Sequence, residues 1–71
     1  MRAYVLGPTR DGRGEKALKD ALRASLPGDV PVGIDLQHGE VRVGSDADPQ
    51  VVVFAIESAG YPVTSVEEIR S

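Results

Sequence analysis

The sequence predicts an α+β fold, because segments with helical and with strand periodicity follow one another between turns rich in glycine and proline. Two segments repeat apolar residues at positions i, i+3, i+4 and i+7, which is the spacing of one helix face. Two others alternate apolar and polar residues, as a strand does when one of its faces is buried. With a short apolar segment near each end, the order is β-α-β-β-α-β. This order predicts a ferredoxin-like sandwich, in which both helices cover one face of a four-stranded antiparallel sheet.

The first part of the chain is expected to form a strand, a loop and a helix. Residues 3–6 are apolar and aromatic, which favours a strand. Residues 7–14 contain three glycines and one proline and are therefore expected to form a loop. A helix is expected over residues 15–25, and Pro27 and Gly28 end it. The stripe at helical spacing consists of Leu18, Ala21, Leu22 and Ser25.

A β-hairpin is expected in the middle of the chain, where two alternating segments follow each other. Their apolar positions are Val30, Val32, Ile34, Leu36, Val41 and Val43. Gly39 lies between the two segments and can adopt the positive φ of a tight turn. The only histidine, His38, lies in the same turn. We expect it to face solvent rather than to bind a metal or act as a base.

The second helix is expected to follow the pair Asp48 and Pro49. Asp48 is a favourable N-cap, Pro49 suits the first helical position, and Gly60 can end the helix. Apolar residues at helical spacing are Val52, Ala55, Ile56 and Ala59. Residues 51–54 are β-branched or aromatic and favour a strand by intrinsic propensity, but the length, the cap and the stop favour a helix. A last strand is expected to cover residues 62–66 and to continue beyond them.

Length and composition limit the possible functions. A chain of 71 residues, 41% of them hydrophobic, forms a single domain (1–71) with a small core. It contains no cysteine, which excludes disulfides and thiolate metal ligands. A pI of about 4.9 and an aromatic content of 4% argue against nucleic acid as a partner. Since no apolar run is long enough to cross a membrane, we expect a small cytoplasmic protein without membrane insertion and without a cofactor.

Two blocks of sequence carry a resemblance to a known family. They are VGIDLQHGEVRV at residues 32–43 and AIESAGYPV at residues 55–63. Both blocks resemble the heavy-metal-associated domain of copper chaperones, mercury-binding proteins and metal-transporting ATPases. The resemblance extends from about Ala3 to Val66. It implies the same β-α-β-β-α-β sandwich that the periodicity predicts, and a family role in binding and transferring metal ions.

The chain departs from this family in the metal-binding loop. The family sequence is Gly-Met-Thr-Cys-x-x-Cys, between the first strand and the first helix. The corresponding residues here are GPTRDGR, so that Arg10 and Arg13 take the two cysteine positions and Pro8 takes the methionine position. Arginine is positively charged and offers only hydrogen-bond donors, whereas copper(I), mercury and zinc in such loops require soft thiolate ligands. We therefore expect no metal site of the family type.

The same loop is a candidate anion site. Arg10 and Arg13 supply charged donors, and the first helix presents its positive end to the loop. Gly12 and Gly14 leave backbone N–H groups accessible. A phosphate group or a carboxylate of a partner is the expected ligand. Alternatively, both arginines are solvated or form ion pairs with the acidic residues beside them. Such exposed pairs contribute little to the stability of the fold.

Three aromatic residues are candidates for an interaction surface, namely Tyr4, Phe54 and Tyr61. If Ala3 and Val5 face the helices, Tyr4 points to the open face of the sheet. If the apolar residues at helical spacing in the second helix face the sheet, Phe54 lies on the flank of that helix or toward solvent. Exposed aromatic residues can mark a partner surface, although half-burial at the edge of a small domain would also explain them. We expect a monomer or a weak homodimer.

Together these features favour a protein-docking or anion-binding module rather than an enzyme. No serine or threonine has a histidine or lysine at a spacing typical of a nucleophile and its base. The expected partner is an acidic protein surface, attracted to Arg10 and Arg13 by charge complementarity that salt weakens. One alternative is a metal-binding chaperone-type protein that uses oxygen ligands or a site shared with a partner. Another is a small-ligand regulatory domain.

Overall fold

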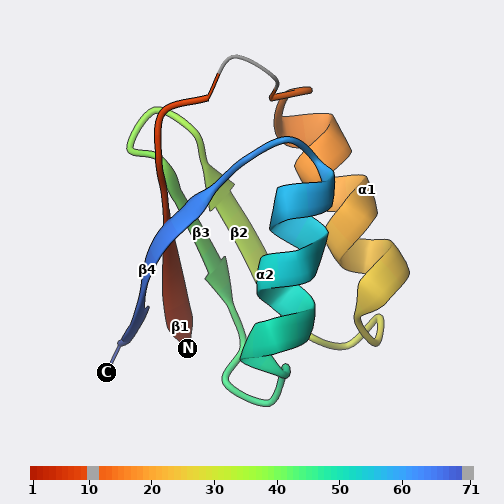
Figure 1. Ribbon diagram of the computed structural model, residues 1–71. Helices are drawn as coiled ribbons and strands as arrows, with labels where there is room; N and C mark the ends of the chain where they lie inside the picture. Colours follow the sequence, from red (N-terminus) through yellow and green to blue (C-terminus); the bar gives the residue numbers. More distant parts are fainter. Residues whose placement is uncertain (10–11, 70–71) are drawn as a thin grey trace.

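The computed structural model describes residues 1–9 and 12–69 and confirms the predicted α+β fold (Figure 1). The elements are β1 Arg2–Leu6, α1 Glu15–Ser25, β2 Val32–Asp35, β3 Glu40–Val43, α2 Pro49–Ser58 and β4 Val63–Glu68. The strands form one sheet in the order β2-β3-β1-β4, and all neighbouring strands are antiparallel. This arrangement is consistent with a ferredoxin-like fold.

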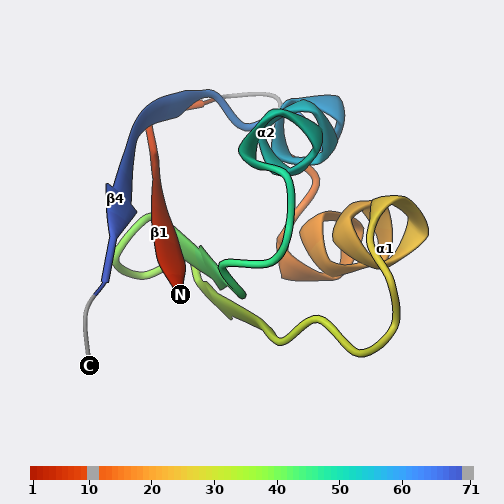
Figure 2. The same ribbon diagram turned by 90° about the horizontal axis from the view of Figure 1, so that it is seen from below.

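Both helices lie on the same face of the sheet, and no described element covers the opposite face (Figure 2). α1 contacts β2, α2 contacts β4, and the two helices contact each other. The largest fully buried side chains are Tyr4, Leu18, Leu22, Ile56, Val41, Val43 and Val52. They come from both helices and from the two central strands. α2 therefore buries the whole stripe that its spacing predicts, whereas α1 buries Leu18 and Leu22 of its stripe, leaves Ala21 half-buried and leaves Ser25 exposed.

α2 is helical although residues 51–54 favour a strand by intrinsic propensity. The Asp48 carboxylate accepts a hydrogen bond from the Gln50 N–H at 2.9 Å, and Pro49 occupies the first helical turn. Gly60, with a φ of 91°, follows the end of the helix. Capping, a glycine stop and burial of the apolar stripe therefore outweigh the local preference.

β2 is shorter than the alternating pattern predicts, because it begins at Val32 rather than at Val30. Pro31 has no N–H to donate to a ladder of strand hydrogen bonds. Its carbonyl accepts a hydrogen bond from the Gly44 N–H at 3.0 Å, which is the last backbone contact of this segment with the end of β3. The predicted tight turn between β2 and β3 is present, and Gly39 adopts a φ of 61° there.

The connections gather at the two ends of the sandwich (Figure 1). The loop after β1, the β2–β3 turn and the α2–β4 connection lie at one end. The α1–β2 and β3–α2 loops lie at the other end, where the amino terminus also lies. The Leu6 N–H donates to the Gly39 carbonyl at 2.7 Å, which joins the loop after β1 to the β2–β3 turn.

The expectation that Tyr4 points to the open face of the sheet is wrong. Tyr4 lies opposite Val41 of β3 and is fully buried in the core. Ala3 and Val5 take the other face, where Ala3 lies opposite Arg42. Apolar residues occur on both faces of β1, so the alternation of its side chains does not decide which face packs against the core. A shift of one residue in the strand register would exchange the buried and the exposed face. Tyr4 is therefore a core residue and cannot contact a partner of the folded protein.

Tyr4→Phe tests the packing of this core residue. The Tyr4 hydroxyl is buried and has no hydrogen-bond partner among the described residues. Burial raises the pKa of the Tyr4 hydroxyl, and the Arg2 guanidinium nearby acts in the opposite direction. The substitution therefore removes a buried polar atom together with a weak interaction with Arg2, and we expect the free energy of unfolding to change by less than about 1 kcal/mol. Urea denaturation measures the change. A decrease of more than about 1 kcal/mol would show that the hydroxyl makes a stabilising interaction in solution.

Candidate functional site

The glycine-rich loop, described at residues 7–9 and 12–14, is held against the α2–β4 connection at residues 59–62. Hydrogen bonds from both described parts of the loop reach this connection. They run from the Gly7 N–H to the Pro62 carbonyl (2.9 Å), from the Thr9 hydroxyl to the Gly60 carbonyl (2.6 Å) and from the Arg13 N–H to the Ala59 carbonyl (3.3 Å). The loop is therefore fixed at the point where β1 ends and α1 begins.

Tyr61, a candidate for the interaction surface, has a structural role in this loop. Its hydroxyl accepts a hydrogen bond from the Gly14 N–H at 2.8 Å. Its ring lies so close to Gly12 that a Cβ atom there would come within 2.5 Å of the ring carbon Cζ. A side chain at position 12 would therefore displace the ring. Both the ring and the hydroxyl of Tyr61 hold the loop in place.

The loop offers fewer donors to an anion than the sequence suggests. The N–H groups of Arg13 and Gly14 both donate within the protein. Gly14 is the N-cap of α1, and the acidic Glu15 follows it in the first turn, where its charge opposes anion binding. The Arg13 side chain is exposed and forms no ion pair with a described residue, whereas Arg10 lies outside the described residues. The anion site stays a prediction that depends on the arginine side chains.

The outer side of α2 carries exposed apolar residues. Phe54 is 71% exposed, the highest fraction among the large apolar residues of the described part of the chain, and this confirms that it lies outside the core. Val51 is 37% exposed, and Val53 is half-buried. We call Val51, Val53 and Phe54 the α2 patch. A shallow hollow on the same side is lined by Pro49, Gln50, Val53, Phe54 and Glu57. The outer side of α2 therefore carries an exposed aromatic ring, and Gln50, Glu57 and Ser58 are the polar residues exposed beside it.

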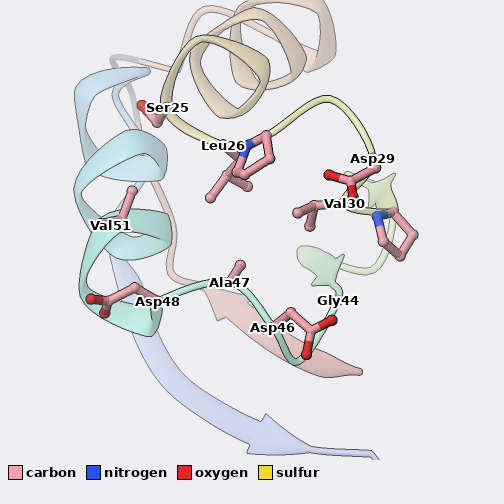
Figure 3. A pocket seen from close by; sticks show the side chains of 11 residues that line it. Ser25, Leu26, Asp29, Val30, Gly44, Asp46, Ala47, Asp48 and Val51 are labelled. Atoms are coloured by element: carbon pink, nitrogen blue, oxygen red, sulfur yellow. The ribbon is translucent and has the colours of Figure 1, made fainter.

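A second hollow, which we call the acidic groove, is lined by residues of the α1–β2 and β3–α2 loops (Figure 3). Both loops lie at the end of the sheet opposite the glycine-rich loop (Figure 1). The groove has a volume of about 360 Å³ and lies between the α1–β2 loop, the β3–α2 loop and the start of α2. Its apolar lining consists of Leu26, Pro27, Val30, Pro31, Ala47 and Val51. Asp29, Asp46 and Asp48 also line it, and no described lysine, arginine or histidine does. Sequence reasoning did not find this site.

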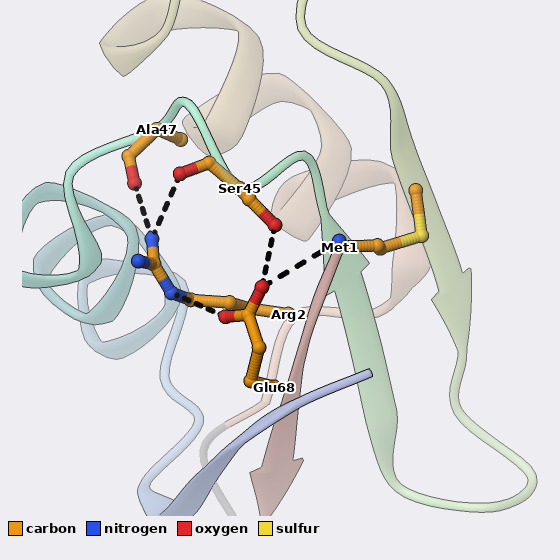
Figure 4. A network of polar contacts seen from close by, with 5 residues as sticks. All are labelled: Met1, Arg2, Ser45, Ala47 and Glu68. Carbon is orange, nitrogen blue, oxygen red and sulfur yellow. Dashed lines mark hydrogen bonds and ion pairs between the residues drawn. The ribbon is translucent and has the colours of Figure 1, made fainter. Parts of the chain in front are cut away.

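A polar network fixes the β3–α2 loop, which forms one side of the acidic groove (Figure 4). The Arg2 guanidinium donates to the carbonyl oxygens of Ser45 and Ala47, each at 3.0 Å. Its Nε atom pairs with the Glu68 carboxylate at 3.0 Å. The Ser45 hydroxyl donates to Glu68 at 2.8 Å, and the Met1 ammonium group lies 3.9 Å from the same carboxylate. β1 and β4 together therefore hold the loop in position.

His38 lies in the β2–β3 turn and faces solvent, as predicted, with 76% of its side chain exposed. Its Nδ1 atom lies 2.6 Å from the carboxylate of Asp35. This hydrogen bond lowers the pKa of Asp35 below its usual value. Within the described residues, no three histidine, aspartate or glutamate side chains gather as ligands for a metal ion.

The chain matches no protein-family model, no curated protein and no solved structure. The resemblance to the heavy-metal-associated family therefore depends on the two sequence blocks and on a compatible fold, and membership stays a prediction. Over residues 1–9 and 12–69, neither helix is long and apolar enough to cross a membrane.

Tyr61→Phe removes the acceptor of the Gly14 N–H. We expect the free energy of unfolding to fall by about 1 kcal/mol, because a partly buried donor loses its partner. The Gly14 amide hydrogen should also exchange faster with solvent. Urea denaturation and hydrogen exchange measured by NMR test both effects, and Tyr4→Phe is the matched control. Unchanged stability together with unchanged exchange at Gly14 would show that this bond is not formed in solution.

Glu68→Gln tests the polar network. The hydrogen bond from Ser45, followed by the charges of Arg2 and the amino terminus, lowers the pKa of Glu68 from its usual value of 4.5. The carboxylate therefore stabilises the fold above that pH, and this contribution is lost as the pH falls through the lower, folded-state pKa. We expect the variant to be less stable than wild type at neutral pH and to lose less stability on acidification.

Thermal unfolding at several pH values between neutral and strongly acidic measures this difference. Glu67→Gln is the control, since it removes the same charge from the neighbouring position on β4. Equal unfolding midpoints of the two variants at neutral pH would contradict a stabilising role of the network.

Proposed function

We propose that this chain is a non-catalytic docking module that binds a partner protein through the α2 patch. The observation that carries the proposal is the 71% exposure of Phe54 on a helix whose only charged residue is Glu57. A helix at the surface of a small domain normally turns polar residues outward. α1 follows this rule, because Lys16, Lys19 and Arg23 are all exposed.

The energetics of Phe54 also support a role in binding. Complete burial of a phenylalanine side chain is worth about 1.5–3 kcal/mol relative to exposure. The folded protein leaves most of this gain unrealised at Phe54, so a partner that covers the ring would obtain it. Aromatic residues that enter a partner's pocket often dominate the affinity of an interface. The patch therefore suits a small interface centred on one aromatic residue.

The charges around the α2 patch favour a partner other than a second copy of this chain. Asp48 lies at the start of α2 and Glu57 near its end, and the helix contains no basic residue. A twofold dimer through the patch would place α2 against itself and bring these acidic residues together. A partner with basic residues around an apolar centre would instead complement the patch.

The resemblance to the heavy-metal-associated family also supports docking as the function. It implies that the glycine-rich loop contacts partner domains by charge complementarity. Since Arg10 and Arg13 replace the cysteines of that loop, an acidic partner surface at this end of the molecule stays a second prediction. The α2 patch is the better supported site, because all its residues are described and two of them, Val51 and Phe54, are exposed.

Peptides that bind the folded wild-type protein are first selected from a random displayed library. Their binding to Phe54→Ala then tests the proposal. NMR with ¹⁵N-labelled protein maps where the selected peptides bind. We expect shift changes centred on residues 50–57 and binding to the variant that is weaker by at least about tenfold. The free energy of unfolding should stay within about 0.5 kcal/mol of wild type, because the side chain is exposed.

Val66→Ala is the matched control, because it shortens an exposed apolar side chain on β4 (43% exposed). Equal affinity of wild type and Phe54→Ala, or shift changes outside α2, would contradict the proposal. Sedimentation equilibrium of the protein alone gives a further test. A dimer that Phe54→Ala dissociates would assign the patch to self-association and refute a different partner.

A further inference from the structure

We infer that the acidic groove binds a basic side chain, lysine or arginine, of the partner segment that covers the α2 patch. This inference rests on the proposed function and adds the chemical class of the partner. The groove and the patch are continuous, because Val51 is exposed on α2 and also lines the groove. A single bound segment can therefore contact both, with an apolar residue against Phe54 and a basic residue in the groove.

The shape of the groove suits a long side chain with an apolar stem. Its volume of about 360 Å³ lies in the range of clefts that hold small groups. Leu26, Val30 and Ala47 surround the hollow, and Val51 closes it on the side of α2 (Figure 3). Lysine and arginine side chains bury their methylene groups along such walls while the charged end stays near polar atoms.

The charge of the groove favours a cation. The carboxylate of Asp29 points toward the hollow, and Asp46 lies along its other side (Figure 3). Asp48 also lines the groove, but its carboxylate points away from the hollow and caps α2. The groove adjoins the last turn of α1 at Ser25, where the helix dipole adds partial negative charge, and also the start of α2, where the dipole is positive. The preference for a cation therefore depends on the carboxylates and not on the helix dipoles. No described basic residue lines the groove to neutralise these groups.

The nearby Arg2 does not neutralise the groove. Its guanidinium contacts the backbone of the β3–α2 loop and is paired with the Glu68 carboxylate at 3.0 Å. Arg2 is not among the residues that line the groove. It therefore holds the loop in position. Neither Asp29 nor Asp46 forms an ion pair with a described residue, so both can bind an external ligand.

The arrangement favours an organic cation over a metal ion. The described residues contain no group of three carboxylates or histidines close enough to hold a metal. The aspartates are distributed around apolar walls instead (Figure 3). A guanidinium or ammonium group at the end of a flexible side chain can be bound by separate carboxylates, because it requires no fixed coordination sphere.

The test uses N-acetyl-leucyl-arginine amide as the probe and N-acetyl-leucyl-citrulline amide as its neutral counterpart of the same shape. Each is titrated into ¹⁵N-labelled protein at low ionic strength and followed by NMR. We expect shift changes at residues 26–30 and 44–51. The arginine probe should bind about threefold more tightly than the citrulline probe, as expected for partly exposed ion pairs. High salt should reduce this preference.

Asp29→Asn combined with Asp46→Asn should abolish the preference for arginine. Asp48 is left unchanged in this variant, because it caps α2. Glu15→Gln combined with Asp20→Asn is the matched control, since it removes two acidic charges that do not line the groove. Equal binding of the two probes to wild type, or a preference that persists in the Asp29 and Asp46 variant, would overturn the inference.

The outcomes separate this inference from the proposed function. If selected peptides require Phe54 but wild type does not prefer the arginine probe, the docking function stands and the cation site is refuted. If Phe54→Ala has no effect on selected peptides while the groove prefers arginine, the docking face is refuted and the cation site stands.

Discussion

The apolar layer between the sheet and the two helices is the constraint on which the rest of this structure depends. A chain of 71 residues has few side chains with which to build a core, and Tyr4, Leu22 and Ile56 are among the largest that it buries. Because both helices must reach this layer, packing fixes their inner sides and leaves their outer sides free to vary. The charged outer side of α1 and the exposed phenylalanine on α2 are therefore properties that folding alone does not require. The contrast between the two helices is the main reason to assign a binding role to α2.

Most of the fold could be predicted, because its signals are local in sequence. α2 followed from Asp48 and Gly60 at its two ends, even though its middle favours a strand. The orientation of β1 could not be predicted in this way. Its two faces, represented by Val5 and Tyr4, are both apolar, and only pairing with β3 decides which one is buried.

The candidate site was less accessible to sequence reasoning. The exposure of Phe54 follows from helical spacing, but the groove beside it joins Asp29 and Asp46 from two separate loops. The predicted topology already places these two loops at one end of the sheet, and this signal was available. The shape of the groove could not be predicted from the sequence. It depends on how Val30 and Ala47 pack, and the spacing of apolar residues does not describe this packing. The role of Tyr61 in the glycine-rich loop is likewise a contact between distant parts of the chain.

The close approach between Gly12 and Tyr61 has a consequence for the evolution of this protein. The two positions lie far apart in the chain, yet the ring occupies the space that a side chain at position 12 would need. Homologous chains are therefore expected to change at both positions together, with a larger residue at 12 accompanied by a smaller one at 61. Such covariation would identify distant relatives even where the glycine-rich loop has diverged in length and charge.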